Sequence, residues 1–482
     1  MRRFPKRFLK KVWLLLMMPG LGLVATWEAP AQSTRPAQTR STQTRPARTE
    51  ARVADARIAA ALGSASAARI QANVEKLVSF GTRATISAQD PEAIAAGRGI
   101  GAAREWIKAE FERYSTECGG CLEVKEDSFT EEPGERIAQP TVITNVYAVL
   151  KGTGDPARMV LVTGHYDSRN SGTLDGSGDA PGANDDASGT AVSLECARIL
   201  SKMSSKMKFA ATTIFLTVAG EEQGLNGSRH FAKMAKEQGW NLEAVLNNDI
   251  VGGDKSAEQN HSVVRVFSEG LPLSATEQDI RRIRGLGGES DSGSRQVARY
   301  IADVGRAYAG AIGVRPMLVL RLDRYLRGGD HSSFNQEGFS AVRFTEFRED
   351  FHHQHQDVRA EKGIEYGDLA KFVDFDYVAR VVRLNAATLA SLAAAPAPPA
   401  NVHLVMKGLE NDSTLTWDAS PGAVEYEVLW RATTSPDWEH VRKFGNVTRA
   451  TLKLSKDNVI FAVRAEDRAG HASLAVVPVP ER

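Results

Sequence analysis

Two nearly continuous apolar runs constrain the fold more than any other feature of the chain. Residues 159–164 read Met-Val-Leu-Val-Thr-Gly, and residues 212–219 read Thr-Thr-Ile-Phe-Leu-Thr-Val-Ala. Strands that are apolar along their whole length are typical of a sheet buried on both faces. A helical pattern follows each run, over residues 186–202 and 225–236. We therefore expect a mostly parallel sheet covered by helices on both faces.

The same alternation extends in both directions along the chain. Further strands are predicted at residues 142–150, 242–250, 263–267, 317–320 and 341–345, and further helices near residues 55–77, 94–114, 294–309 and 369–392. The predicted fold class is an α/β three-layer sandwich with a mostly parallel mixed central sheet. In such sheets, functional sites form outside the carboxyl ends of the strands.

The N-terminus has the three parts of a secretory signal. Basic residues come first, an apolar run broken at Pro19-Gly20 follows, and Ala29-Pro30-Ala31 forms a small-x-small cleavage site. We expect residues 1–31 to be removed and the mature protein to be secreted or periplasmic, without a membrane span. An uncleaved anchor is the alternative, although the apolar run is short for a bilayer. Residues 32–54 have almost no large apolar side chain and predict a disordered linker.

The composition changes again near the C-terminus. A globular domain is predicted over residues 55–393, and a Pro/Ala linker over residues 394–400. Short alternating strands fill residues 401–482 and predict a small all-β sandwich with Trp417 and Tyr426 in its core. This pattern resembles a fibronectin type III module. We expect the module to bind a surface, a polymer, a protein or the larger domain itself.

Charge and cysteine content exclude some classes of protein. The formal net charge is only +1, and several of the basic residues lie in the first eleven positions, so nucleic acid is not expected as a partner. Cys118 and Cys121 form a single C-x-x-C motif, whereas a zinc ribbon needs two. In an oxidising compartment we expect these two cysteines to form a disulfide, and Cys196 to pack in the core.

Ionisable residues gather where the predicted strands end. His165 and Asp167 follow one strand, Glu221 and Glu222 the next, and Asp249 a third. A Gly/Pro/Asn/Ser turn at residues 181–189 adds Asp185 and Asp186, and a histidine cluster follows the strand that ends at Thr345. Each group alone has an ordinary explanation as a cap or a solvated loop. Together they predict one site at one edge of the sheet.

The residue types match a pair of metal ions. Two neighbouring ions need one carboxylate that they share. In addition, each ion needs about one histidine and one further carboxylate of its own. Asp185 can be shared, His165 and Asp249 can complete one ion, and Glu222 with a late histidine can complete the other. Glu221 remains free to act as a general base, and Asp167 is placed to orient His165.

These motifs resemble metallopeptidase family 28, the co-catalytic zinc peptidases that include bacterial leucyl aminopeptidases and glutamate carboxypeptidase II. The resemblance covers residues 70–393 and implies a zinc exopeptidase fold with two Zn2+ ions. It supports the roles given above and implies a cis peptide bond between Asp185 and Asp186. The family's last motif has its ligand histidine four residues before an acid. Counting back from Asp357 selects His353, and His352 is the alternative because the aromatic residue is one place out.

Three further residues are weaker candidates. Asp330 and His331 resemble the family's Asp-His-x-x-Phe motif and are expected near the site, in the pocket or behind the ligands, with His331 a minor alternative ligand. Tyr325 could donate a hydrogen bond to an oxyanion. The expected function is that of an exported aminopeptidase in which a zinc-bound hydroxide attacks the first peptide bond of a peptide substrate. A carboxypeptidase or dipeptidase, a single-zinc glutaminyl cyclase-like enzyme and a non-enzymatic surface-binding module are the alternatives.

Overall fold

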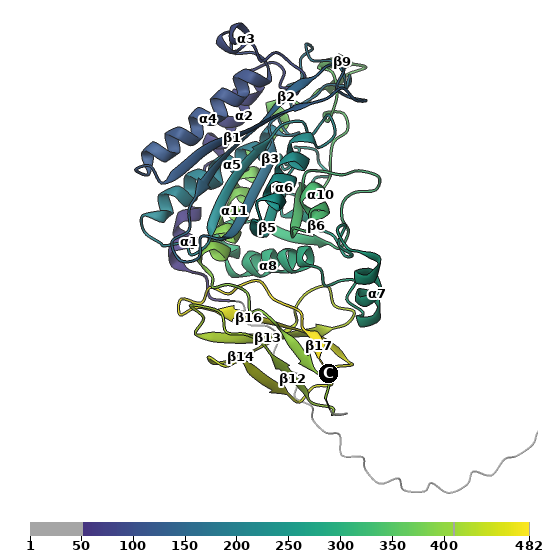
Figure 1. Ribbon diagram of the computed structural model, residues 1–482. Helices are drawn as coiled ribbons and strands as arrows, with labels where there is room; N and C mark the ends of the chain where they lie inside the picture. Colours follow the sequence, from purple (N-terminus) through teal and green to yellow (C-terminus); the bar gives the residue numbers. More distant parts are fainter. Residues whose placement is uncertain (1–51, 408–409, 482) are drawn as a thin grey trace, which may run out of the picture. The chain divides into compact units, whose positions relative to one another are not determined.

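The computed structural model of this chain describes residues 52–407 and 410–481 (Figure 1). The predicted signal peptide, and the predicted linker up to residue 51, lie outside these residues. Within the described part, no helix combines the length and the apolar character needed to cross a membrane.

A mixed sheet with the strand order β1-β2-β4-β3-β5-β8-β6-β7 forms the centre of the molecule. Its strands are β1 (Leu122–Glu131), β2 (Thr141–Leu150), β3 (Arg158–His165), β4 (Thr212–Val218), β5 (Asn241–Asn248), β6 (Val263–Ser268), β7 (Arg315–Val319) and β8 (Ala341–Glu346). The four central strands, β4, β3, β5 and β8, run parallel. Strand β2 pairs antiparallel with β1 and β4, whereas β6 pairs antiparallel with β8 and parallel with β7. The predicted mostly parallel mixed sheet is therefore confirmed.

Helices cover both faces of this sheet. In chain order, the helices of the described residues are α1 (Ala56–Leu62), α2 (Ala67–Val78), α3 (Pro91–Ala95), α4 (Gly99–Glu117), α5 (Ala187–Ser204), α6 (Asn226–Glu237), α7 (Glu277–Leu286), α8 (Gly293–Ala307), α9 (Ala309–Ile312), α10 (His331–Gln336) and α11 (Phe375–Ala394), with a 3-10 turn at Ala370–Phe372. On β3, Val160 and Val162 join the core formed with α2, α4, α5, α8 and α11. The intervening Leu161 packs instead with Phe231 of α6 and Phe334 of α10. Alternate side chains of one strand thus fill two separate cores.

Strand β8, the last strand of the central sheet along the chain, is followed by a long connection. It contains a small hairpin of β9 (Arg359–Glu361) and β10 (Ile364–Tyr366) before α11 begins. The residues of the hairpin are mostly exposed and have no hydrophobic pattern from which it could be predicted.

Two small sheets form the C-terminal part of the chain. One has the order β15-β12-β11-β17 and the other β14-β13-β16. The strands are β11 (His403–Val405), β12 (Ser413–Thr416), β13 (Glu425–Ala432), β14 (His440–Phe444), β15 (Arg449–Leu452), β16 (Val459–Glu466) and β17 (Val479–Glu481). Trp417 and Tyr426 are buried in their shared core, with ring centroids 5.4 Å apart. The all-β character is confirmed, and the likeness to fibronectin type III stays a prediction.

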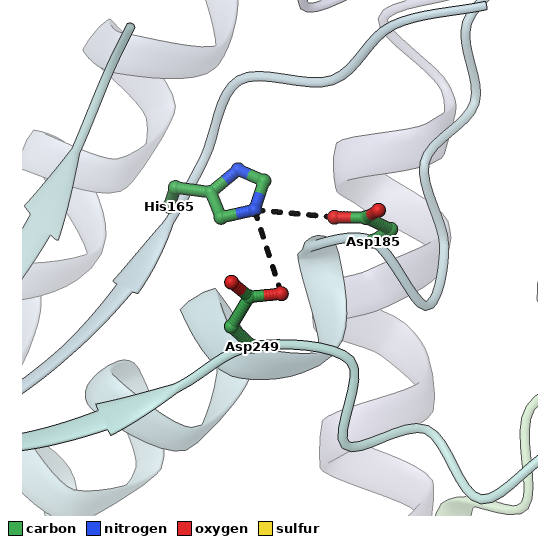
Figure 2. Close-up of side chains that lie close together, drawn as sticks. All are labelled: His165, Asp185 and Asp249. Atoms are coloured by element: carbon green, nitrogen blue, oxygen red, sulfur yellow. Dashed lines mark ion pairs between the residues drawn. The ribbon is translucent and has the colours of Figure 1, made fainter. Parts of the chain in front are cut away.

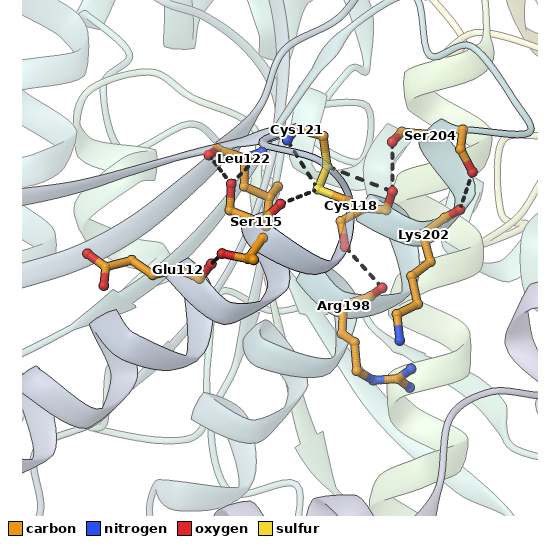
Figure 3. Close-up of a disulfide and its surroundings, with 11 residues drawn as sticks. Glu112, Ser115, Cys118, Cys121, Leu122, Arg198, Lys202 and Ser204 are labelled. Carbon is orange, nitrogen blue, oxygen red and sulfur yellow. Dashed lines mark hydrogen bonds between the residues drawn. A yellow bond between two sulfur atoms is a disulfide. The ribbon is translucent and has the colours of Figure 1, made fainter.

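A disulfide joins Cys118 and Cys121 at the turn between α4 and β1 (Figure 3). Next to it, the Ser115 hydroxyl donates a hydrogen bond of 2.7 Å to the carbonyl of Leu122 and ties the end of the helix to the strand. Cys196 is a free, buried cysteine in α5.

Candidate metal centre

Five side chains that can bind metal reach the same edge of the sheet. His165 is the last residue of β3, Asp249 follows β5 directly, and Glu222 lies just beyond β4. Asp185 lies in the turn before α5, and His355 lies in the loop between β8 and β9. All but the partly buried His355 are buried. Ionisable groups are costly to bury unless an opposite charge compensates them, so this edge requires cations.

His165, Asp185 and Asp249 form the first group of potential ligands. Nε2 of His165 lies 3.2 Å from Oδ1 of Asp185 and 4.0 Å from Oδ1 of Asp249 (Figure 2). Ligand atoms around one zinc ion lie roughly 3.3–3.5 Å apart, because each bond is about 2.0–2.2 Å long. The three atoms therefore surround a space of the right size for one ion.

Asp185, Glu222 and His355 form the second group. Nε2 of His355 lies 2.9 Å from Oδ2 of Asp185 and 3.0 Å from Oε1 of Glu222. Asp185 belongs to both groups and presents a different carboxylate oxygen to each. Burial alone would raise the pKa of Asp185, yet the neighbouring His355 and His165 hold it well below its usual range. This carboxylate is therefore ionised and can bridge two ions.

The donor set fits zinc. Imidazole nitrogens and carboxylate oxygens are the ligands of catalytic zinc sites, in which three protein ligands leave a position open. Two buried ligand atoms, Nε2 of His165 and Oε1 of Glu222, lie close to an oppositely charged group, yet neither makes a hydrogen bond of good geometry within the described part of the chain. Buried polar atoms without such a bond are rare in folded proteins and call for an explanation, and a bound ion supplies one.

The structure brings His355, rather than the predicted His353, to Asp185 and Glu222. Nδ1 of His353 instead lies 3.0 Å from Oδ2 of Asp254, and its ring stacks on Phe372 at a centroid distance of 3.7 Å. The prediction of His353 depended on its distance of four residues from Asp357. It is wrong, because His355 is the histidine that lies beside Asp185 and Glu222. Asp357 itself accepts hydrogen bonds from the backbone N–H and the hydroxyl of Ser171.

The acid that holds the aspartate turn is Asp368, beyond the β9–β10 hairpin. Its carboxylate accepts hydrogen bonds from the backbone N–H groups of Asn184 (2.8 Å) and Asp185 (2.7 Å). The β9–β10 hairpin lies between the histidine cluster and Asp368, so the acid that contacts the turn is not the one four residues after His353.

The other late candidates lie outside both groups. The alternative His352 is exposed, and Nε2 of His331 contacts the carbonyl of Leu322 at 3.0 Å. Tyr325 is 79% exposed, and its hydroxyl accepts a hydrogen bond from Arg321. Asp330 is fully buried behind the site, and burial raises its pKa to about 7.

Asp167 organises the residues beside the two groups. Nδ1 of His165 lies 3.1 Å from its carbonyl oxygen and 3.3 Å from its Oδ1. The same carboxylate accepts hydrogen bonds from the backbone N–H groups of Glu221 and Glu222 and from the hydroxyl of Thr85. It therefore fixes the ring of His165 and the turn that carries the two glutamates.

Glu221 belongs to neither group of ligands but lies close to both. Burial raises its pKa well above the usual range, and Asp249 and Glu222 raise it further, while His165 opposes the shift. A carboxyl group with a raised pKa beside a metal site is suited to accept and release a proton.

The aspartate turn is held from two sides. Asp186 caps α5 by accepting a hydrogen bond from Gly189, and its other oxygen accepts one from the backbone N–H of His165. The Asp185–Asp186 peptide bond is cis, as the resemblance implied. On the other side, the fully buried guanidinium of Arg83 donates hydrogen bonds to the carbonyls of Tyr166, Leu77, Pro181 and Gly182. The two aspartates have different roles, since one faces the site and the other fixes the turn.

Two arginines contact the ligands and were not predicted. Nη2 of Arg343 lies 2.9 Å from Oδ1 of Asp249, and Nε of Arg169 lies 2.8 Å from Oε2 of Glu222. Arg343 is fully buried in the middle of β8. A charged residue inside a buried strand was the available signal, because such a residue needs a buried partner.

Comparisons with known proteins identify relatives of this chain. A model of peptidase family M28 matches residues 145–375. A probable zinc metalloprotease from Pyrenophora tritici-repentis is 45% identical over 428 residues, which cover 87% of this chain and 86% of the relative. Another from Pyricularia oryzae is 47% identical over 433 residues, covering 87% and 84%.

Solved structures show more distant likeness. The aminopeptidase LapA of Legionella pneumophila is 20% identical with a TM-score of 0.49, over 72% of this chain and 77% of that one. A glutaminyl cyclase from Fimbriiglobus ruber is 18% identical with a TM-score of 0.46, over 68% and 95% of the two chains.

Proposed function

Because this chain belongs to peptidase family M28, we propose that it is a zinc metallopeptidase that removes the N-terminal residue of peptides. The observation that carries the proposal is the position of Asp185, whose two oxygens face two different sets of ligands. His165 and Asp249 would hold one ion with it, and Glu222 and His355 the other. Bound zinc supplies a Lewis acid that activates water and polarises a carbonyl group.

The residues of the chain itself then handle protons and position. Glu221 takes a proton from the attacking water and passes it to the leaving amine. Its burial and its neighbouring carboxylates support this role, because they keep its proton affinity high. Asp167 orients His165 through the contacts with Nδ1, which leaves Nε2 directed at the carboxylates of the first group.

Metal content is the first test. The catalytic centre of the purified protein should bind two zinc ions that are lost when Asp185 is replaced, and hydrolysis of a leucyl nitroanilide should be lost on chelation and restored by zinc. A protein with one catalytic ion that cyclises N-terminal glutamine would instead be the cyclase-like enzyme. The absence of zinc binding would contradict every metalloenzyme assignment.

A substrate panel is the second test, because aminopeptidases, carboxypeptidases and dipeptidases of this kind share the same metal ligands. Peptides with a free amino group should be cleaved, and the same peptides with an acetylated amino group should not. Cleavage of the acetylated peptides from their carboxyl end would identify a carboxypeptidase. Cleavage of dipeptides alone would identify a dipeptidase.

Export is part of the proposal. The basic and apolar segments before Ala31 support removal of residues 1–31, so the mature chain should begin at Gln32. N-terminal sequencing of protein recovered from outside the cytoplasm tests this expectation. A mature chain that still begins at Met1 would favour the uncleaved anchor.

A further inference from the structure

A small cavity lies beside the aspartate turn and is lined in part by Asn184 and Asp185. Its volume is about 10 Å³, which is roughly the room that one water molecule or one ion needs. The residues around it include five carboxylates and one histidine, and they are Asp185, Asp254, Glu349, Asp350, Asp368 and His353. No lysine or arginine is among the lining residues that the structure gives for this cavity. Its wall is therefore strongly negative.

Two of these carboxylates already have other partners. Glu349 forms ion pairs with Arg265, Arg324 and Arg327, and Asp368 receives the two backbone N–H groups of the aspartate turn. The remaining negative charge comes mainly from Asp254 and Asp350, with Asp185 shared by the catalytic groups.

Asp254, Asp350 and His353 each have a potential ligand atom within 4.8 Å of those of the other two. Nδ1 of His353 lies 3.0 Å from Oδ2 of Asp254 and 3.7 Å from Oδ2 of Asp350. These distances fall within the range of 2.9–4.0 Å found between His165 or His355 and the carboxylates of the two catalytic groups. The three residues have the same types as the first catalytic group, one histidine and two aspartates.

We propose that Asp254, Asp350 and His353 bind a third divalent metal ion, separate from the two of the catalytic centre. An imidazole ligand excludes Mg2+ and Ca2+ as the natural occupant, because these ions prefer oxygen ligands alone. A borderline ion such as Zn2+ accepts one nitrogen and two carboxylate oxygens and completes its coordination with water. The cavity provides the space for that water.

The third ion ties together two loops that form the catalytic centre. Asp254 belongs to the loop after β5, which begins with the ligand Asp249. Asp350 and His353 belong to the loop after β8, which also carries His355. An ion between these loops fixes the distance of His355 from the sheet edge. Its role is therefore positional rather than catalytic.

The simplest rival explanation is an ion pair without metal between His353 and Asp254. The variant Asp350→Asn separates the two explanations. It removes one carboxylate from the proposed site, yet it leaves the 3.0 Å contact between His353 and Asp254 in place. Asp376→Asn is the matched control, because Asp376 is an exposed aspartate in the first turn of α11.

The experiment measures bound zinc per chain by elemental analysis after reconstitution with Zn2+ alone and removal of free ion. We expect three ions in the wild-type protein and in Asp376→Asn, and two in Asp350→Asn. Equal zinc content in wild type and Asp350→Asn, or two ions in the wild type, would overturn the proposal. Circular dichroism confirms that Asp350→Asn is folded, and His353→Gln serves as a second ligand variant that should also lose one ion.

The result is independent of the proposed peptidase activity. A protein with two ions that cleaves peptides would lack the third site and keep its function. A protein with three ions that cleaves no peptide would keep the site and lose the proposed function.

Discussion

Replacing Arg343 by methionine should destabilise the metal-free protein strongly and increase its response to zinc. The guanidinium is fully buried between two carboxylates, at 2.9 Å from Asp249 and 3.1 Å from Asp323. Methionine keeps much of the side-chain volume but removes the charge. Both aspartates then lose a buried partner, although Asp323 keeps its contact of 3.0 Å with Arg324.

The expected loss follows from the burial of the pair. Removing one partner of a buried ion pair costs about 3–5 kcal/mol, because the other charge stays in a poorly solvated place. Total stabilities of proteins are about 5–15 kcal/mol, so the effect should be large. A zinc ion bound by His165, Asp185 and Asp249 gives Asp249 a new cation. Zinc should therefore stabilise Arg343→Met more than wild type, by about 1–3 kcal/mol, with a matching gain in affinity.

The dependence on pH has a definite sign. Burial opposes ionisation of Asp323, but Arg343 and neighbouring cations lower its pKa below the usual range. In wild type, this carboxylate contributes stability above about pH 4, and that contribution is lost as the pH falls towards its lowered pKa. The variant lacks most of the contribution. The difference in stability between the two proteins should therefore narrow below about pH 4.

Urea unfolding with and without zinc, repeated above and below about pH 4, measures all three effects. Arg348→Met is the matched control, because Arg348 and its partner Glu258 are both exposed, and its effect should stay within about 0.5 kcal/mol. The reasoning fails if metal-free Arg343→Met is as stable as wild type. It also fails if zinc stabilises the variant no more than wild type.

Three further outcomes are expected. Glu221→Gln should retain its zinc and lower kcat by about 10²–10⁴-fold, since the residue lies outside the ligand groups, and metal analysis beside steady-state kinetics checks this. His355→Ala should lose an ion of the catalytic centre and nearly all activity, whereas His353→Ala should keep measurable turnover at saturating zinc; equal loss in both would contradict the geometry. Serine at both Cys118 and Cys121 should lower the free energy of unfolding by no more than about 2 kcal/mol, because the closed loop is very short, and urea titration measures it.

The site residues at the sheet edge could be predicted because their position depends on local sequence. His165, Glu222 and Asp249 each follow an apolar strand within a few residues, and parallel strands bring such positions together. The strand pattern fixes their location with no knowledge of side-chain contacts. Asp185 was predictable for a related reason, since a turn rich in small residues precedes a buried helix.

The last ligand could not be predicted in the same way. His353 and His355 lie in one irregular loop, and their directions depend on contacts with Asp254, Phe372 and the sheet edge. The β9–β10 hairpin hides the relation to Asp368, because its residues are mostly exposed and carry no apolar period.

One strand was missed for a different physical reason. Residues Leu122–Glu131 form the edge strand β1, which alternates between partly buried and exposed side chains and contains five acidic or basic residues in its sequence Leu-Glu-Val-Lys-Glu-Asp-Ser-Phe-Thr-Glu. An edge strand has a neighbour on one side only, so its composition need not be apolar.

The hydrogen bonds of Arg83 limit how far the N-terminus of an active fragment can be shortened. Arg83 lies well before residue 145, where the match to the family model begins, and yet it holds the carbonyls on either side of the aspartate turn. A gene fragment that encodes only residues 145–375 would omit this clamp together with α2 and α4, which cover one face of the sheet. The segment by which the family is recognised, residues 145–375, is therefore shorter than the segment that we expect to fold and work on its own. Expressed fragments and domain swaps should begin upstream of α1.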